Sequence, residues 1–258
     1  MGGSGDFVSK TIVSAKQFVR KMLYGRAFKE DKETYIRENK RKNFEYNKKF
    51  ERPFYTDRYQ EAGALGAYFW QDLWAARHLY KDMPDEHYDI GSRIDGFIGH
   101  ICCFIEKITL IDVRQLDKVI PNVNYICMDA TKLEKFPDES ISSISSLCAL
   151  EHFGLGRYGD QVNPEGCFEA FRAIQRVVRG GGKAYIAVPV GKEHLEFNAH
   201  RIFYAQTVVD SFSDMELLEF SAVHDLEDKI EYNIDIHKYD NEDDNAGMRF
   251  GLFVFEKK

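Results

Sequence analysis

Three acidic residues stand at the ends of successive short apolar segments, where carboxylates can bind a nucleoside. They are Asp89, Asp112 and Asp129. A carboxylate after the second segment can accept hydrogen bonds from both hydroxyls of a ribose, and one after the third can bond the exocyclic amine of adenine. Because the carboxyl ends of parallel strands meet at one edge of a sheet, the three acids predict a nucleoside site in that crevice.

The loop that follows Asp89 reads DIGSRIDG. Gly91 and Ser92 are small, which lets the backbone N–H groups of a turn between a strand and a helix approach a ligand closely. The guanidinium of Arg93 is predicted to bond a ligand carboxylate as a two-pronged pair, and the alternative is that this side chain crowds the ligand.

A second group of candidates follows the fourth apolar segment, which ends at Leu147. Glu151 and His152 come next, and the imidazole of His152 suits a general base at neutral pH because its ordinary pKa is about 6.5. The alternative is that His152 packs over the ligand and bonds Glu151 or the backbone. His200, after the fifth segment, is the rival base.

Two loops at the same edge offer candidates for binding a substrate. The first has three glycines within residues 154–159 and is predicted to form a substrate lid, with a plain connecting loop as the alternative. In the second, Asn198 either contacts substrate or caps a helix. Two arginines, one from each loop, are predicted to clamp a phosphate or carboxylate. The substrate candidates are Arg157, Tyr158, Asp160, Asn198 and Arg201.

The elements that must position these residues follow from the rhythm of apolar residues. Residues 8–49 have helical spacing and predict an N-terminal helical extension, residues 1–60, before the main domain, residues 61–258. A second helix is expected over 62–80. Short apolar runs then alternate with polar helical stretches, which predicts an α/β doubly wound sheet of seven strands whose last two form an antiparallel edge hairpin. The expected strands are 87–90, 108–112, 125–128, 144–147, 183–188, 216–223 and 250–256.

Charge and composition narrow the classes of partner. The net charge of −7 argues against nucleic acid, and no apolar run is long enough to span a bilayer. Residues 10–52 are basic and residues 225–244 acidic, and the favoured interpretation is that both are solvated faces. The alternatives are that the two blocks pair with each other, that the basic one contacts an anionic membrane surface or a substrate, or that the basic helical arm forms a homodimer contact. The five cysteines lack the spacing of a metal site, and the expected compartment is the cytoplasm.

The successive motifs resemble those of class I S-adenosylmethionine-dependent methyltransferases. The resemblance rests on the acid-x-Gly segment, the acids at 112 and 129, LCALEHFG after the fourth segment, and FEAFRAIQRVVRGGGKAYIAVP. It implies a Rossmann-like fold and S-adenosyl-L-methionine as cofactor. Arg93 and Asp95 depart from it, because glycines usually stand at these positions. The cofactor-binding residues that it implies are Asp89, Gly91, Ser92, Arg93, Asp112, Val113, Asp129, Ala130 and Leu147.

Two longer segments, EHFGLGRYGD and FNAHRIF, resemble a bacterial family of unknown function associated with surface-polysaccharide genes. The reading that these likenesses favour is O-methylation of a small polar acceptor such as a sugar or sugar-nucleotide. One alternative is a non-catalytic protein of this fold that binds or scaffolds partners, favoured by the replaced glycines. The other is a nicotinamide-dependent oxidoreductase, disfavoured because the first loop lacks G-x-G-x-x-G.

Overall fold

The computed structural model describes residues 24–63, 65–226, 229–241 and 247–258. The chain divides into two compact units, Met1–Ala64 and Leu65–Lys258. In the first unit, residues 24–38 form a helix that Asn39 ends, because its side chain bonds the backbone of residues 41 and 44 in competition with helical hydrogen bonds. Three short 3-10 turns follow, at Lys42–Phe44, Lys48–Phe50 and Asp57–Tyr59. The predicted helix is therefore too long at its end, and residues 8–23 lie outside the described residues.

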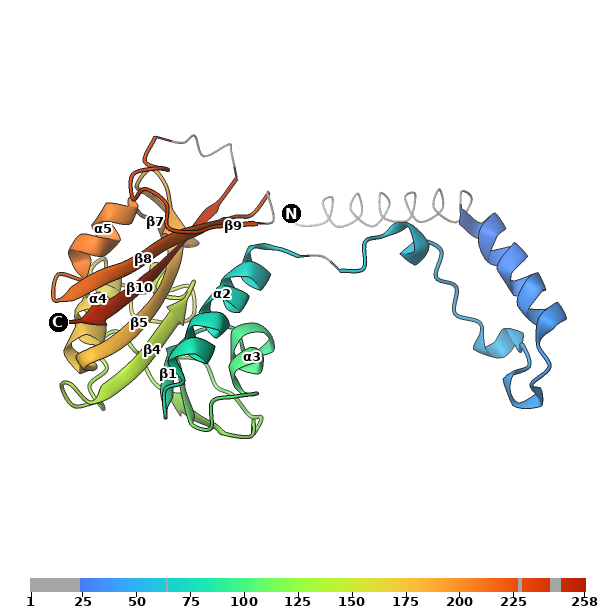
Figure 1. Cartoon of the computed structure of the whole chain (residues 1–258), viewed down its shortest axis with the longest axis horizontal. Coiled ribbons are helices and arrows are strands. Elements are labelled where there is room, and N and C mark those ends of the chain that lie inside the picture. The colour runs from blue at the N-terminus through green and yellow to red at the C-terminus, as the bar shows by residue number, and fades with distance from the viewer. Residues whose placement is uncertain (1–23, 64, 227–228, 242–246) are drawn as a thin grey trace, which may run out of the picture. The chain divides into compact units, whose positions relative to one another are not determined.

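The second unit is built on a twisted sheet with helices on both faces (Figure 1). In its described residues this sheet has eight strands in the order β3-β2-β1-β4-β5-β10-β8-β9, so the doubly wound α/β architecture is confirmed, with one strand more than expected. Strands β1 to β5 are parallel, and β10 is antiparallel to both β5 and β8. The strand bounds are β1 His87–Ile90, β2 Ile108–Asp112, β3 Val123–Cys127, β4 Ile141–Leu147, β5 Val178–Val190, β8 Met215–His224, β9 Lys229–Glu231 and β10 Arg249–Lys257.

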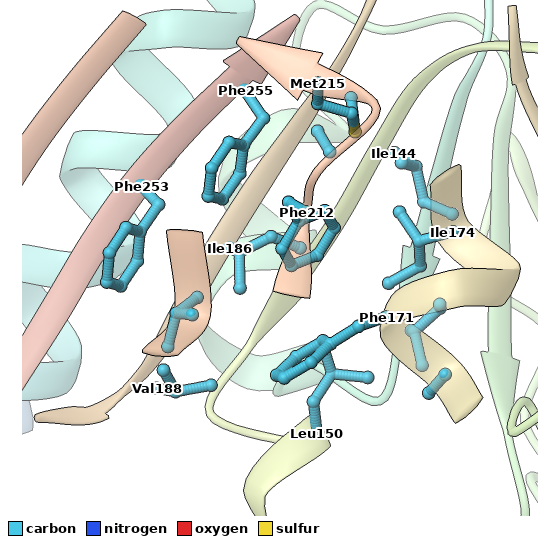
Figure 2. Packing of buried hydrophobic residues seen from close by; sticks show 14 of the residues in the cluster. Ile144, Leu150, Phe171, Ile174, Ile186, Val188, Phe212, Met215, Phe253 and Phe255 are labelled. Carbon is cyan, nitrogen blue, oxygen red and sulfur yellow. The ribbon is translucent and has the colours of Figure 1, made fainter. Parts of the chain in front are cut away.

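Alternating side chains of the central strands serve two separate cores. On β10, Phe253 and Phe255 face helices α4 (Gly166–Val177) and α5 (Ala205–Ser211), whereas Leu252 and Val254 face the opposite side. Figure 2 shows the first core, in which Phe171 of α4 lies among residues of the sheet. Burial on both faces explains why these strands read as continuous apolar runs in the sequence.

The second core is covered by α2 (Ala67–Asp82) and α3 (Gly99–Ile101). Helix α2 begins five residues later than expected and ends where Met83 adopts a left-handed conformation (φ 42°). Trp74 is buried on its inner face and donates a hydrogen bond from Nε1 to Glu219 at 2.9 Å. This contact fixes α2 against β8.

Three features of the second unit differ from the expectation. Strand β10 lies between β5 and β8, so the last two predicted strands are antiparallel neighbours, but β9 forms the edge. The connections β2–β3 and β3–β4 are loops without a helix in this fully described stretch. Asn198, considered as a helix cap, instead lies in the turn of a hairpin of β6 (His194–Glu196) and β7 (His200–Ile202). Among the described residues, no helix is long and apolar enough to cross a bilayer.

Candidate functional site

A cavity of about 600 Å³ opens at the carboxyl ends of the parallel strands. Its wall contains Gly91 after β1, Asp112 at the end of β2, Asp129 after β3 and Cys148 after β4. A volume of this size suits a nucleoside-sized ligand. Much of the remaining wall comes from the glycine loop, residues 153–166, which lies between the 3-10 turn Leu150–His152 and α4.

Gly91 lines the cavity at a position where a side chain would not fit. Its φ of +70° lies in the left-handed region, and a Cβ built on it would lie 2.9 Å from the Cβ of Ala149. Both the backbone conformation and the close approach therefore require glycine. Its N–H donates to Ile111 O at 2.9 Å, which joins the ends of β1 and β2 beside the cavity.

Asp89 lies beneath this loop rather than on the cavity wall. Its side chain is fully buried and accepts hydrogen bonds from Ser92 N at 2.9 Å, Ser92 Oγ at 2.7 Å and Ser145 Oγ at 2.5 Å. Burial nevertheless raises the pKa of Asp89 to about 6. Ser92 Oγ also accepts from Leu147 N at 3.1 Å, so Asp89, Ser92 and Leu147 hold the loop in shape without lining the cavity.

His87 belongs to the same network. Its ring is buried between Ser143 and Ser145, with each nitrogen 2.8 Å from a hydroxyl oxygen. Because Ser145 donates to Asp89, it accepts from Nε2–H of His87, and Nδ1 accepts from Ser143. Burial lowers the pKa of His87 to about 3, in agreement with this neutral form.

The carboxylate of Asp112 faces the cavity but is already bonded by a neighbour. Arg114 donates to Oδ1 from both N and Nε at 2.9 Å, and to Oδ2 from Nη2 at 2.5 Å. Arg114 itself lines the cavity. The sequence pattern contained this residue, but no signal separated it from other exposed arginines.

The third acid and its neighbours also lie where the sequence predicted. Asp129 lines the cavity and is exposed, and its Oδ1 accepts from Thr131 N at 2.8 Å and Thr131 Oγ1 at 2.6 Å. Val113 and Ala130 are part of the same wall. Arg93 is not, because its guanidinium turns back to Asp95, with Nε 3.1 Å and Nη2 2.8 Å from the carboxylate oxygens.

The end of β4 brings a buried acid and an imidazole together. Glu151 is 2% exposed, its Oε1 lies 3.5 Å from His152 Nε2, and its Oε2 has no hydrogen-bond partner among the described residues. Burial raises the pKa of Glu151 to about 8, whereas burial lowers that of His152 to about 4. His152 Nδ1 lies 2.7 Å from Ala199 O and must donate to it, which leaves the lone pair on Nε2.

The glycine loop is organised by its own acid. Asp160 accepts from Gly154 N at 2.9 Å, Gly156 N at 3.3 Å and Tyr158 N at 3.2 Å. A Cβ on Gly154 would lie 1.9 Å from Asn163 O, so this glycine is required by close packing as well as by its φ of +75°. Tyr158 and Asp160 line the cavity. Internal hydrogen bonds therefore define the conformation of the loop.

The two arginines of the predicted anion clamp bond the protein's own backbone. Arg201 donates to Glu151 O at 3.2 Å, Phe153 O at 2.7 Å and Pro164 O at 3.1 Å. Arg157 donates to Ala199 O at 2.9 Å. Neither arginine lines the cavity, and both donate to carbonyl groups of neighbouring loops, so the structure does not bring the predicted clamp to the cavity wall.

The remaining candidates lie on the β6–β7 hairpin. His200 Nε2 is 3.1 Å from Glu196 Oε2, and its ring centre is 6.2 Å from that of His152. Burial lowers the pKa of His200. Asn198 is exposed in the turn of the hairpin. Within the described ranges, no group of three or more His, Cys, Asp or Glu side chains is placed to hold a metal ion.

Sequence reasoning missed the contribution of helix α2 to the site. Cys148, which lines the cavity, has its Sγ 2.8 Å from Gln71 Oε1. Asp72, also buried, packs against the loop after β1, and burial raises its pKa to about 6. The signal in the sequence was the polar pair Gln71-Asp72, which interrupts the apolar face of the predicted helix.

A family model described as "Caenorhabditis protein of unknown function, DUF268" matches residues 113–252, more than half of the chain. The matched region begins directly after Asp112 and includes the Glu151-His152 pair, the glycine loop and the β6–β7 hairpin. None of the curated proteins matches the sequence. The expected link to bacterial surface-polysaccharide genes stays a prediction.

Two solved structures share the fold at low identity. The [4+2]-cyclase SpnF matches over 76% of this chain and 88% of its own, with a TM-score of 0.52 and 16% identity. A 1,6-didemethyltoxoflavin-N1-methyltransferase of Burkholderia thailandensis, with bound 1,6-didemethyltoxoflavin and S-adenosylhomocysteine, matches over 73% of this chain and 78% of its own, with a TM-score of 0.54 and 13% identity. The second unit therefore has the class I methyltransferase fold.

Proposed function

We propose that this chain, which belongs to the DUF268 family, is an S-adenosylmethionine-dependent methyltransferase that acts on a hydroxyl group of a small polar acceptor. The observation that carries the proposal is the single cavity into which Gly91, Asp112 and Asp129 converge from three adjacent strands. Open α/β sheets bind ligands at this edge.

The residues of the cavity fit an adenosyl group. Gly91 clears space beside the loop, Asp112 offers a carboxylate for ribose hydroxyls, and Asp129 offers one for the adenine amine. Ala130 and Val113 supply apolar surface for the base. The Burkholderia enzyme, whose structure contains S-adenosylhomocysteine, supports this assignment through its fold.

The cofactor supplies an activated methyl group, and the chain must orient the acceptor and remove its proton. We assign proton removal to the Glu151–His152 pair, because His152 lines the cavity, keeps a lone pair on Nε2 and places this nitrogen 3.5 Å from Oε1 of the buried Glu151. Glu151 itself does not line the cavity, and its carboxylate, when ionised, would stabilise the protonated imidazole.

The acceptor is placed at the loop side of the cavity. Tyr158 and Asp160 border it, while His200 and Asn198 lie on the adjoining hairpin. A sugar or sugar-nucleotide is the proposed acceptor, in cytoplasmic polysaccharide synthesis, and the resemblance of the loop sequences supports it. We do not propose that Arg157 and Arg201 bind the acceptor directly, because both donate hydrogen bonds to backbone carbonyls.

Binding of S-adenosylhomocysteine, measured by calorimetry and thermal melting, tests the proposal. We expect saturable binding with a stabilisation of about 2–4 kcal/mol at high ligand concentration. Asp112→Asn and Gly91→Ala should weaken binding at least about tenfold, since the first loses a charged acceptor and the second fills a site that has no space. Lys183→Met, which removes an ion pair with Asp82, serves as the control. Absence of heat and of stabilisation in the wild type would exclude the function.

One observation favours a non-catalytic binding protein instead. Asp112 is bonded by Arg114, and Arg93 and Asp95 pair with each other where glycines are usual. Ligand binding does not distinguish such a protein from an enzyme, because a binding protein can also bind the adenosyl ligand. A binding protein transfers no methyl group and therefore does not depend on Glu151 for activity. Methyl transfer from labelled cofactor to sugar acceptors, lost in Glu151→Gln while ligand affinity is retained, separates the enzyme from this alternative.

A further inference from the structure

We propose that Arg114 competes with the ribose of an adenosyl ligand for Asp112, so that the ligand must displace this guanidinium to bind fully. The inference rests on the proposed function, because the competing ligand is the one assigned to the cavity. It names Arg114 as a residue that sets cofactor affinity, which neither the family match nor the motifs of the sequence identify.

Arg114 is held in place by contacts on several sides. Its guanidinium and backbone N–H make three hydrogen bonds to Asp112, at 2.9, 2.9 and 2.5 Å. Its carbonyl oxygen accepts from the hydroxyl of Tyr125 on β3 at 2.5 Å. The guanidinium carbon lies 4.9 Å from the ring centre of Tyr158 in the glycine loop. Contacts from β3 and from the glycine loop thus direct this side chain onto the carboxylate.

The geometry leaves too few acceptor sites for a ribose. A carboxylate offers about four lone-pair directions, of which Arg114 uses three. The two neighbouring hydroxyls of a ribose need two. A ligand that bonds Asp112 through both hydroxyls must therefore remove at least one prong of Arg114.

The Arg93–Asp95 pair is a useful comparison, because it is a similar ion pair that would not compete with a ligand in the cavity. It has the same two-residue spacing and the same two-pronged contact, at 3.1 and 2.8 Å. However, neither of its members lines the cavity, whereas Asp112 and Arg114 both do. The position of the pair in the cavity wall is what makes Arg114 a competitor.

Displacement of Arg114 also reaches the glycine loop. The Tyr158 ring lies near two guanidinium groups, that of Arg114 at 4.9 Å and that of Arg157 at 5.2 Å. When Arg114 leaves Asp112, one of these two contacts changes. Displacement of Arg114 by the ribose therefore also changes the contacts of Tyr158, which forms part of the cavity wall on the acceptor side.

Calorimetric titration of the full chain with S-adenosylhomocysteine tests the competition. Arg114→Met should bind about three- to tenfold more tightly than the wild type, because the cost of breaking a two-pronged pair is removed. Arg114→Lys, which keeps the charge but loses the second prong, should lie between them. Lys183→Met, which removes a cation paired with Asp82, should bind like the wild type. Melting curves without ligand confirm that each variant is folded.

Salt provides a second readout of the same competition. The side chain of Arg114 is 55% exposed and that of Asp112 10%, so salt screens this pair in part, and the ratio of the two affinities should fall between about 50 and 500 mM NaCl. Equal or weaker binding by Arg114→Met, with a wild type that binds, overturns the competition and leaves the proposed function intact. Failure of the wild type and of all variants to bind removes the proposed function, and the competition with it.

Discussion

Glu151 shows how one side chain connects the stability of this protein with its chemistry. It is 2% exposed, and its Oε2 has no hydrogen-bond partner in the described part of the chain. An ionised carboxylate in such surroundings loses hydration that no donor replaces. Folding therefore favours the protonated acid, and burial raises the pKa of Glu151 to about 8. The group that is costly to ionise belongs to the pair to which we assign proton removal.

The pH dependence of unfolding tests this without knowledge of the acceptor. The raised pKa means that the folded state binds a proton that the unfolded state releases, so stability falls as pH rises from the ordinary pKa of 4.5 through about 8. Between about pH 6 and pH 8 the wild type should lose about 2 kcal/mol more than Glu151→Gln, measured by urea unfolding.

Two comparisons sharpen that measurement. Glu165→Gln, at an exposed position before α4, should follow the wild type, because water solvates this carboxylate in both states. Asp72 and Asp89, whose pKa values burial raises to about 6, contribute mainly below that pH and are present in every variant. Parallel curves for wild type and Glu151→Gln would show that Glu151 ionises normally in the folded protein.

For individual residues, the sequence predicted their place in the site better than it predicted their hydrogen-bond partners. Asp112 and Asp129 line the cavity as expected, since the ends of parallel strands must meet at one edge. Asp89 does not, because two serines distant by three and 56 positions turn its carboxylate inward. Partners of this kind depend on strand register and on side-chain direction, neither of which a single sequence specifies.

Arg201 connects the β6–β7 hairpin to the glycine loop. This side chain extends from β7 and donates three hydrogen bonds to carbonyl groups of residues 151, 153 and 164. The carbonyls of residues 153 and 164 lie near the two ends of the glycine loop, and that of residue 151 lies just before it. Arg201 therefore ties the loop into a closed shape, where an anion clamp was expected.

Loss of Arg201 should loosen that element. Arg201→Met removes three charge-assisted hydrogen bonds and leaves carbonyl groups without a donor, at a cost of about 2–4 kcal/mol in the free energy of unfolding. Limited proteolysis should cut within residues 153–166 faster than in the wild type. Arg172→Met, at an exposed position on α4, should change neither quantity. An unaltered cleavage rate in Arg201→Met would assign the closure of the loop to Asp160 instead.

The strands were the most predictable elements, and their edges the least. Strands β1 and β2 have the predicted bounds, because buried parallel strands are short apolar runs between polar segments. β9 was missed since its three residues, KIE, lie in an acidic stretch and pair on one side only. The hairpin was missed because its strands have three residues each and little alternation.

At the scale of the whole molecule, the buried structure belongs to the second unit. Both apolar clusters and all strands of the described chain lie within Leu65–Lys258. In the described residues of the first unit, 24–63, no side chain is buried, and large aromatic residues such as Phe44 and Phe50 are exposed. A segment without a core of its own contributes little to cooperative unfolding.

Residues 65–258 produced alone should therefore fold and bind. We propose them as an independent domain and expect a melting temperature within about 3 °C of the full chain, because both apolar clusters and all strands of the described chain lie within them. Affinity for S-adenosylhomocysteine should be unchanged, since every residue of the cavity wall lies after position 65. A matched fragment that also lacks β10, residues 65–248, should not fold, because β10 joins β5 to β8 in the centre of the sheet. A large fall in the melting temperature of the 65–258 fragment would contradict its assignment as an independent domain.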